Sequence, residues 1–284
     1  MTLDKELLNN LVNITSSAAI SSFPHIGKKN KELADKAATD DMRKNLNKLD
    51  INGEVVIGEG ELDEAPMLYI GEKLGTGKGP FIDIAVDPVE GTNFVANNLP
   101  GALSVIAVSN KGNLFHAPET YMNKIAVGND VPIDAVDLDF SVEKNIKNIA
   151  DVKNKDIKKI TACLLDTDQK HDVDVFLGIG GGPEGVLAAS ALDAFECKFQ
   201  GRFLFKTAKD INRAKKMGIN DINKKYDLKE IVKEDSIFCA TGITNGDLVK
   251  GIEYKNNIYI SETLITHKAG KLTKIIRREN ILKT

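Results

Sequence analysis

One segment, Phe81 to Thr92, constrains more than any other what this chain can fold into. Its first half is apolar except for Asp83, which predicts a buried strand from Phe81 to Val86. Pro88 has no N–H to donate to a neighbouring strand, so the strand is expected to end at Asp87. In open α/β sheets ligands bind at the carboxyl ends of strands, and this strand end is therefore a candidate site.

Two carboxylates and a hydroxyl follow this strand closely. Asp87 and Glu90 could point at one hard cation, with the Pro88 carbonyl as a further oxygen ligand. Thr92 is placed to be the N-cap of a helix, beside Gly91 and the free N–H groups that bind anions. A metal ion and an anion could meet here, but a strand, a proline turn and a helix cap without any chemistry would leave the same pattern.

A second strand end of similar character precedes this one. Val55 to Ile57 is a short apolar strand that opens into Gly-Glu-Gly-Glu-Leu-Asp-Glu, residues 58–64, where four acidic groups stand among glycines. A solvated acidic loop would explain this segment alone. Two strand ends rich in acid and glycine within one domain favour a cation cluster instead.

A glycine-rich turn forms a third candidate site. Residues 178–185, Gly-Ile-Gly-Gly-Gly-Pro-Glu-Gly, lie between a strand predicted at Val173 to Leu177 and a helix predicted at Val186 to Phe195. Such a turn at a helix N-terminus can cradle a phosphate. It is not a dinucleotide fingerprint, because Pro183 stands where the third glycine should be, and the P-loop Lys-Ser/Thr pair is missing.

The rest of the chain alternates helices and strands. Helical spacing of leucines predicts an amphipathic N-terminal helix, and a second helix is predicted over Lys31 to Leu49. We predict an α/β fold of two subdomains, residues 1–150 and 151–284, the second reached through a charged passage with a surface helix. Further strands are predicted at Leu103–Val108, Leu114–Ala117 (after a turn at 111–113), Ile160–Leu165, Ile258–Ile260 and Leu272–Arg278.

Composition excludes several classes of function. With 38 basic and 41 acidic side chains, a formal charge of −3, the chain lacks the basic surface that nucleic-acid binding requires. We expect no signal peptide and no membrane span, because no apolar run is long enough. Three widely spaced cysteines favour reduced thiols and a cytoplasmic protein. We assign no role to the histidines, since they lie in no metal spacing: His25, His116, His171 and His267.

Together these motifs resemble the metal-dependent, lithium-sensitive sugar and inositol phosphatase superfamily, whose marks are a G-E-[EG] strand end and D-P-[IVL]-[DE]-G-T. Within it the chain looks like class II fructose-1,6-bisphosphatase, from the first helix to near the C-terminus. The segments that carry the resemblance are residues 57–73, 83–92, 117–122, 178–185 and 240–248.

The resemblance implies a layered α-β-α-β-α sandwich with the active site in the cleft between two α/β subdomains. It implies Thr92 as the catalytic residue, and Lys31-Glu-Leu-Ala-Asp35 matches the family's K-[NE]-x-A-D pattern. Asp35 and Glu59 would hold one divalent ion, Mg²⁺ or Mn²⁺, and Asp87, Glu90 and Glu184 another. The substrate would contact Glu90, Gly91, Thr92, Tyr121 and Gly181.

The implied reaction is hydrolysis of the 1-phosphate of fructose 1,6-bisphosphate, a step of gluconeogenesis. The ions would neutralise the phosphoryl oxygens and lower the pKa of a water molecule, which Thr92 would orient. The partner is a small-molecule sugar bisphosphate, and the family suggests a homo-oligomer, a dimer or tetramer. A phosphatase of inositol phosphates or sedoheptulose bisphosphate stays open as an alternative. So does an inactive sugar-phosphate-binding regulator, although such a protein would have no need of Asp87, Glu90 and Thr92.

One connection is short for this family. Family members carry a crossover helix, a strand and substrate-gripping basic residues between the strands that match Ile160–Leu165 and Val173–Leu177. Only residues 166–172 stand there in this chain, and parallel crossovers usually need a dozen residues or more. Either the segment is deleted, with part of the substrate clamp, or the sequence in hand omits it. The undamaged flanking motifs favour an omission, which would leave a Cα separation well above ~3.8 Å near Asp166–Thr167.

Overall fold

The computed structural model describes residues 3–59, 67–163 and 173–280, and the chain forms two compact units. Unit 1 combines Met1–Leu114 with Asp235–Thr284, and unit 2 is Phe115–Glu234. This division differs from the predicted one at 150/151, because the C-terminal strands return to pair with strands of the first unit. Each unit is a β-sheet with helices, which confirms the α/β class. The order of layers across the two units stays a prediction.

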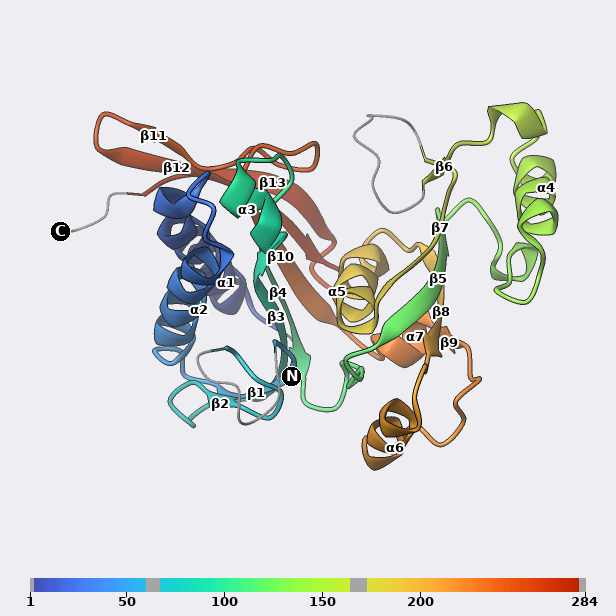
Figure 1. Cartoon of the computed structure of the whole chain (residues 1–284), viewed down its shortest axis with the longest axis horizontal. Helices are drawn as coiled ribbons and strands as arrows, with labels where there is room; N and C mark the ends of the chain where they lie inside the picture. The colour runs from blue at the N-terminus through green and yellow to red at the C-terminus, as the bar shows by residue number, and fades with distance from the viewer. Residues whose placement is uncertain (1–2, 60–66, 164–172, 281–284) are drawn as a thin grey trace. The chain divides into compact units, whose positions relative to one another are not determined.

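Unit 1 is built on an eight-stranded mixed sheet with two long helices beside it (Figure 1). The strand order is β11-β12-β10-β4-β3-β1-β2, and β13 pairs with β12. The helices are α1 (Lys5–Ser22), α2 (Lys31–Leu46) and α3 (Thr92–Asn97), with the 3-10 turn η1 (Phe23–His25). The strands are β1 (Asn52–Ile57), β2 (Lys73–Leu74), β3 (Phe81–Glu90), β4 (Leu103–Asn110), β10 (Ser236–Gly242), β11 (Glu253–Lys255), β12 (Ile258–His267) and β13 (Leu272–Asn280).

The two long helices begin at side-chain caps and bury their apolar stripes. The Leu7 N–H donates to Asp4 Oδ1 at 2.7 Å, and the Leu33 N–H donates to Asn30 Oδ1 at 3.0 Å. Leu11 of α1 is fully buried in the apolar core between helices and sheet. Both predicted helices are thereby confirmed, with α2 ending three residues earlier than expected, at Leu46.

Unit 2 is built on a five-stranded sheet of order β6-β7-β5-β8-β9 (Figure 1). Its central strand β5 (Tyr121–Val127) pairs antiparallel with both neighbours. The other strands are β6 (Ala162–Cys163), β7 (Val175–Gly181), β8 (Lys198–Leu204) and β9 (Tyr226–Asp227). The helices are α4 (Val142–Val152), α5 (Gly182–Asp193), α6 (Ala208–Lys216) and α7 (Leu228–Ile231), with 3-10 turns η2 (Ile133–Ala135) and η3 (Ile157–Lys159).

The strands on either side of the short connection, β6 and β7, are parallel neighbours in the sheet. The two strands pair in parallel, with Ala162 opposite Val175 and Cys163 opposite Phe176. The two strands share only these two residue pairs. Residues 164–174 connect the end of β6 to the start of β7. The predicted break near Asp166–Thr167 lies outside the described residues and stays a prediction.

A predicted return strand at Leu114–Ala117 is wrong. Leu114 makes only a single bridge, because its N–H donates to Asp83 Oδ2 at 3.2 Å. The same oxygen accepts the Gly112 N–H at 2.7 Å in the predicted tight turn, which is present. Asp83 is 2% exposed, so a buried carboxylate on β3 fixes the turn that follows β4.

Asp83→Ala is therefore expected to lower the free energy of unfolding by about 2 to 3 kcal/mol, because two N–H groups lose their acceptor. Chemical denaturation measures the change. Asp83→Asn keeps one acceptor oxygen and should lose less. Equal losses in the two variants would contradict this role for the carboxylate oxygen.

None of the described helices is long and apolar enough to cross a membrane. Cys239 is fully buried, and Cys163 and Cys197 are half-buried.

Candidate active site

A bulge in β3 sets the direction of the Asp87 and Glu90 side chains in unit 1. This strand does not end at Asp87, as predicted, but continues through Pro88 to Glu90. Asp87 pairs with Val105 and Glu90 with Leu103, so β3 carries one residue more than β4 between the two pairs. Side chains three apart in a regular strand point to opposite faces, and the extra residue of a bulge brings them to the same face. Proline is tolerated within a strand at such a bulge.

Glu59 follows β1 at a similar irregularity. The pairing of β1 with β3 shifts between Val55 and Ile57, and the Glu59 N–H then donates to the Leu68 carbonyl at 2.9 Å. A Cβ at Gly58 would stand 2.1 Å from the Leu68 oxygen, so only glycine permits this close approach. The backbone therefore fixes Glu59 at the strand end, whereas the acidic residues 61, 63 and 64 lie outside the described residues.

Four predicted ligands form a continuous chain of carboxyl groups. Asp35 interacts with Glu59, Glu59 with Asp87, and Asp87 with Glu90. Burial raises the pKa of Asp35. Burial, followed by the charge of Asp35, raises the pKa of Glu59 to about 7. Burial, with the neighbouring Glu90 and Glu59, holds the pKa of Asp87 well above its usual range. The structure thus brings Asp35, Glu59, Asp87 and Glu90 together.

These residues fit a hard divalent cation. Asp35 Oδ1 is buried without a hydrogen-bond partner, and its neighbours are carboxylates that repel one another when ionised. A cation would coordinate the unpaired oxygen and neutralise the repelling charges. An all-oxygen donor set suits Mg²⁺ or Mn²⁺. Among the residues described, no group of three or more His, Cys, Asp or Glu side chains is already arranged to hold a metal ion.

The predicted N-cap at Thr92 is wrong by one residue. The cap of α3 is Gly91, whose φ of 85° is in the left-handed region that favours glycine. Thr92 is the first helical residue, half-buried, and its hydroxyl makes no hydrogen bond with any described residue. The hydroxyl is therefore available to a ligand instead of being used by the helix.

The other predicted site residues lie at one end of the sheet of unit 2. Tyr121 begins β5 and is paired with Gly181, the last residue of β7. Glu184 is exposed in the first turn of α5, and its Oε2 lies 1.7 Å from where a Cβ on Gly181 would stand. The Glu184 carboxylate thus occupies the space that a side chain at position 181 would take. The structure brings Tyr121, Gly181 and Glu184 together, and a partnership of Glu184 with Asp87 and Glu90 stays a prediction.

The sequence analysis did not predict the cationic side chain that lies beside Tyr121. The Lys206 ammonium lies 4.9 Å from the centroid of the Tyr121 ring. Lys206 follows β8, whose last residue pairs with Tyr121, so only the pairing of β5 with β8 brings the two residues together. A lysine in a charged stretch gives no sequence signal for this contact.

Fold and site together define an α/β protein with a carboxylate-rich, oxygen-lined site suited to a hard divalent cation. A family model described as bacterial fructose-1,6-bisphosphatase, glpX-encoded, matches residues 5–173 and 167–280. The class 2 fructose-1,6-bisphosphatase 1 of Escherichia coli (strain K12) is 37% identical over 98% of this chain and 95% of its own. That of Haemophilus influenzae is 35% identical over 96% of each chain. A Prochlorococcus marinus (strain MIT 9312) relative, named D-fructose 1,6-bisphosphatase class 2/sedoheptulose 1,7-bisphosphatase, is 34% identical over 93% of this chain and 92% of its own.

The chain therefore belongs to the bacterial class 2 fructose-1,6-bisphosphatase family. Its alignment with the Escherichia coli relative runs over 324 positions, although this chain has 284 residues, so at least 40 positions have no counterpart here. The two matches to the family model overlap at residues 167–173. This agrees with the short connection noted in the sequence.

Proposed function

We propose that this protein hydrolyses the 1-phosphate of fructose 1,6-bisphosphate to give fructose 6-phosphate and phosphate, as its family membership along nearly the whole chain supports. The structural observation that carries the proposal is the chain of carboxyls from Asp35 through Glu59 and Asp87 to Glu90. Phosphoryl transfer depends mainly on positioning and charge neutralisation, and such a site serves both.

Each residue then has a defined task. Asp35 and Glu59 would hold one divalent ion and Asp87 and Glu90 another, to which Glu184 would contribute as the family resemblance implies. Bound Mg²⁺ or Mn²⁺ supplies Lewis acidity and neutralises the negative charge of the phosphate. The Thr92 hydroxyl would orient the attacking water and relay its proton to a nearby carboxylate oxygen.

The backbone N–H groups at the start of α3 would bind the substrate. Because Gly91 caps α3 without a side-chain oxygen, the first N–H groups of the helix remain available to the phosphate. Tyr121 and Gly181 contact the sugar. We further propose a cytoplasmic homo-oligomer that acts in gluconeogenesis.

A second substrate is favoured by one comparison. The Prochlorococcus marinus relative carries sedoheptulose 1,7-bisphosphatase in its name as well. Both sugars are ketose bisphosphates with the reacting phosphate on the first carbon, so the same carboxylates and hydroxyl could serve either.

The direct test is phosphate release from fructose 1,6-bisphosphate with Mn²⁺, with Mg²⁺ and after chelation. We expect turnover with at least one of the two ions and a loss of at least about 100-fold after chelation, because charge neutralisation contributes several kcal/mol. Sedoheptulose 1,7-bisphosphate and inositol 1-phosphate serve as the comparison substrates. Turnover of inositol 1-phosphate alone, or of no sugar phosphate, would contradict the proposal.

A further inference from the structure

An arginine on α2 joins this helix to a segment of unit 1 that follows Glu59 in the chain. Arg43 lies about two helical turns after Asp35. Arg43 Nε donates to Glu72 Oε1 at 2.7 Å, and Arg43 Nη2 donates to Glu72 Oε2 at 3.1 Å. The same Nη2 group also donates to the Met67 carbonyl. The guanidinium therefore binds residues 67–72 at both ends, through a side chain at one end and the backbone at the other.

The same segment is hydrogen-bonded along the end of β1. The Leu68 carbonyl accepts the Glu59 N–H at 2.9 Å, and the Leu68 side chain is fully buried in the core of unit 1. The Gly71 N–H donates to the Val55 carbonyl at 2.8 Å, and the Val55 N–H donates to the Glu72 carbonyl at 2.9 Å. Glu59 is thus fixed to a segment that Arg43 ties to α2.

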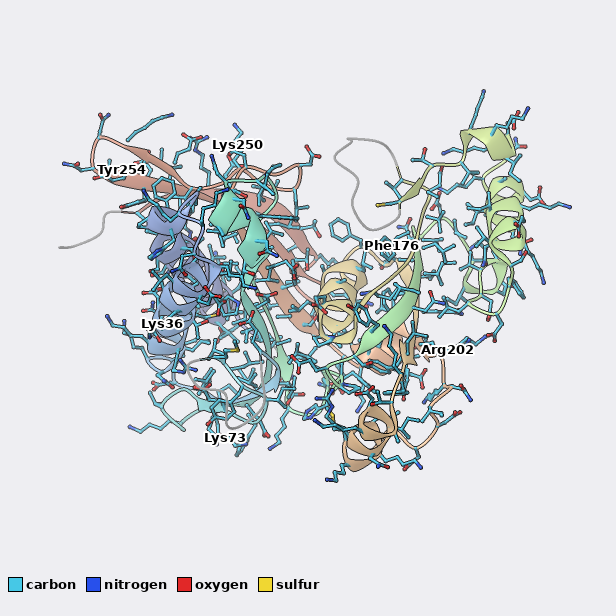
Figure 2. All side chains as sticks on the ribbon, in the orientation of Figure 1. Lys36, Lys73, Phe176, Arg202, Lys250 and Tyr254 are labelled. Carbon is cyan, nitrogen blue, oxygen red and sulfur yellow. The ribbon has the colours of Figure 1, made fainter. Side chains whose placement is uncertain are left out.

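The ion pair between Arg43 and Glu72 is largely shielded from water. The two side chains are 25% and 11% exposed, respectively. Lys36 and Lys73, which follow Asp35 and Glu72 in the chain, mark the two joined parts in Figure 2. Because the carboxylate compensates the guanidinium, the pair contributes geometry to its surroundings and little net charge. A shielded pair of this kind tolerates the loss of one partner poorly.

The link spans the two elements that carry neighbouring carboxyls. Asp35 lies on α2 and Glu59 follows β1, and the two side chains interact directly. When both are ionised they repel each other, which favours separation of the helix from the strand end. Arg43 and residues 67–72 form a cross-link that opposes this separation.

We propose that Arg43 and Glu72 are positioning residues of the metal site, which hold Asp35 and Glu59 at the separation that one divalent ion requires. This inference rests on the proposed function. Side chains outside the ligand set orient the ligands, and their loss typically lowers metal affinity by about 10- to 100-fold. Arginine suits this task because its planar fork binds a carboxylate and a carbonyl at the same time. Neither residue touches the substrate, so the pair acts on the affinity for the ion.

The test is a calorimetric titration of the metal-free protein with Mn²⁺. In Arg43→Met, we expect the Kd for Mn²⁺ to rise about tenfold, while kcat at saturating Mn²⁺ stays within about threefold of wild type. Glu59→Ala identifies the binding event that belongs to this ion, because it removes one of its proposed ligands. Arg43→Lys keeps the charge without the fork and should recover only part of the affinity.

Two further variants separate positioning from stability. Asp83→Ala removes another buried carboxylate of unit 1, at the opposite end of β3 from Asp87, and is the matched control. It should lose stability in chemical denaturation and keep the Kd for Mn²⁺ within about twofold, because Asp83 holds only the turn after β4. The double variant Arg43→Met/Glu72→Met should be more stable than Arg43→Met, since apolar side chains often replace a buried ion pair without loss. Its Kd should stay raised, because apolar contacts are not directional and do not fix the separation of the ligands.

The outcomes separate this inference from the proposed function. Wild-type protein that releases no phosphate from fructose 1,6-bisphosphate with either ion would refute the proposed function, whereas the Mn²⁺ titration judges the inference by itself. Wild-type protein that binds Mn²⁺, together with an unchanged Kd in Arg43→Met, would overturn the inference alone. A double variant that regained both stability and the wild-type Kd would also overturn it, because the ion pair would then serve stability only.

Discussion

Alanine in place of Glu59 or Asp87 is expected to lower phosphate release from fructose 1,6-bisphosphate by at least about 1,000-fold at saturating Mn²⁺, a loss of about 4 kcal/mol of transition-state stabilisation. Both carboxylates belong to the chain that we propose holds the divalent ions. Each substitution removes an oxygen ligand from this chain of carboxyls. Steady-state kinetics over a range of Mn²⁺ concentrations measures the loss.

Glu54→Ala is the matched control for this experiment. Glu54 stands on β1, the strand that Glu59 follows, but outside the chain of carboxyls, and it pairs with Lys73 at 2.6 Å. Its removal should leave turnover within about twofold, because Glu54 does not contact the carboxyls that we propose as metal ligands and its ion pair contributes little to stability. Turnover near the wild-type value in Glu59→Ala or Asp87→Ala would refute the assignment of these residues as metal ligands.

Glu59→Ala should be more stable than the wild-type protein when metal is removed. The folded-state pKa of Glu59 is raised to about 7 from an ordinary 4.5, because burial and Asp35 oppose its charge. The folded state then binds more protons than the unfolded state between these values, so metal-free stability falls as pH rises from about 4.5 to 7. Glu59→Ala removes this loss, on the order of 2 kcal/mol, and should melt at a higher temperature than wild type at pH 8. A lower melting temperature would contradict the repulsion.

The strands of the first unit could be predicted from the sequence, but their irregularities could not. The apolar runs Val55–Ile57 and Phe81–Val86 lie within β1 and β3, as expected from their burial. Pro88 was expected to end β3, because a proline cannot donate to a ladder. The strand instead passes through it at a bulge, and a bulge depends on the partner strand β4, which the local sequence does not reveal.

The proximity of the carboxyls was predictable where residue type and spacing suffice, and their role as metal ligands stays a prediction. Acidic residues at two strand ends pointed to a cation cluster, and the structure brings Glu59, Asp87 and Glu90 together as expected. Asp35 was assigned through family resemblance alone, since an acid near a helix start is common. Lys206 was missed because its contact with Tyr121 depends on the register between β5 and β8.

The division of the chain into units depends on topology in the same way. A boundary near residue 150 follows from a charged passage in the sequence, whereas the units divide at 114/115 and again at 234/235. β10 pairs with β4 across seven residue pairs, so the C-terminal strands belong to the first sheet. Long-range antiparallel pairing of this kind leaves no periodic signal in the strand that returns.

Thr92→Val is expected to lower kcat by at least about 100-fold while leaving stability nearly unchanged, because general acid–base assistance contributes about 10²- to 10⁴-fold. The structure separates the two roles that the sequence left open. Gly91 is the N-cap of α3, and the Thr92 hydroxyl makes no hydrogen bond with a described residue, so valine removes no cap. Valine and threonine also have similar helix propensities. Parallel measurements of kcat and melting temperature test both statements.

Two further variants make the result decisive. Thr92→Ser keeps the hydroxyl and should retain kcat within about tenfold of wild type. Gly91→Ala imposes a Cβ on a residue with φ of 85°, where it would stand 3.0 Å from the Phe94 ring, and should cost about 1 to 2 kcal/mol of stability. That loss shows that the melting measurement can detect damage to this helix start. If Thr92→Val then melted lower by a similar amount and kept its kcat, Thr92 would have a structural role and the proton relay would need another residue.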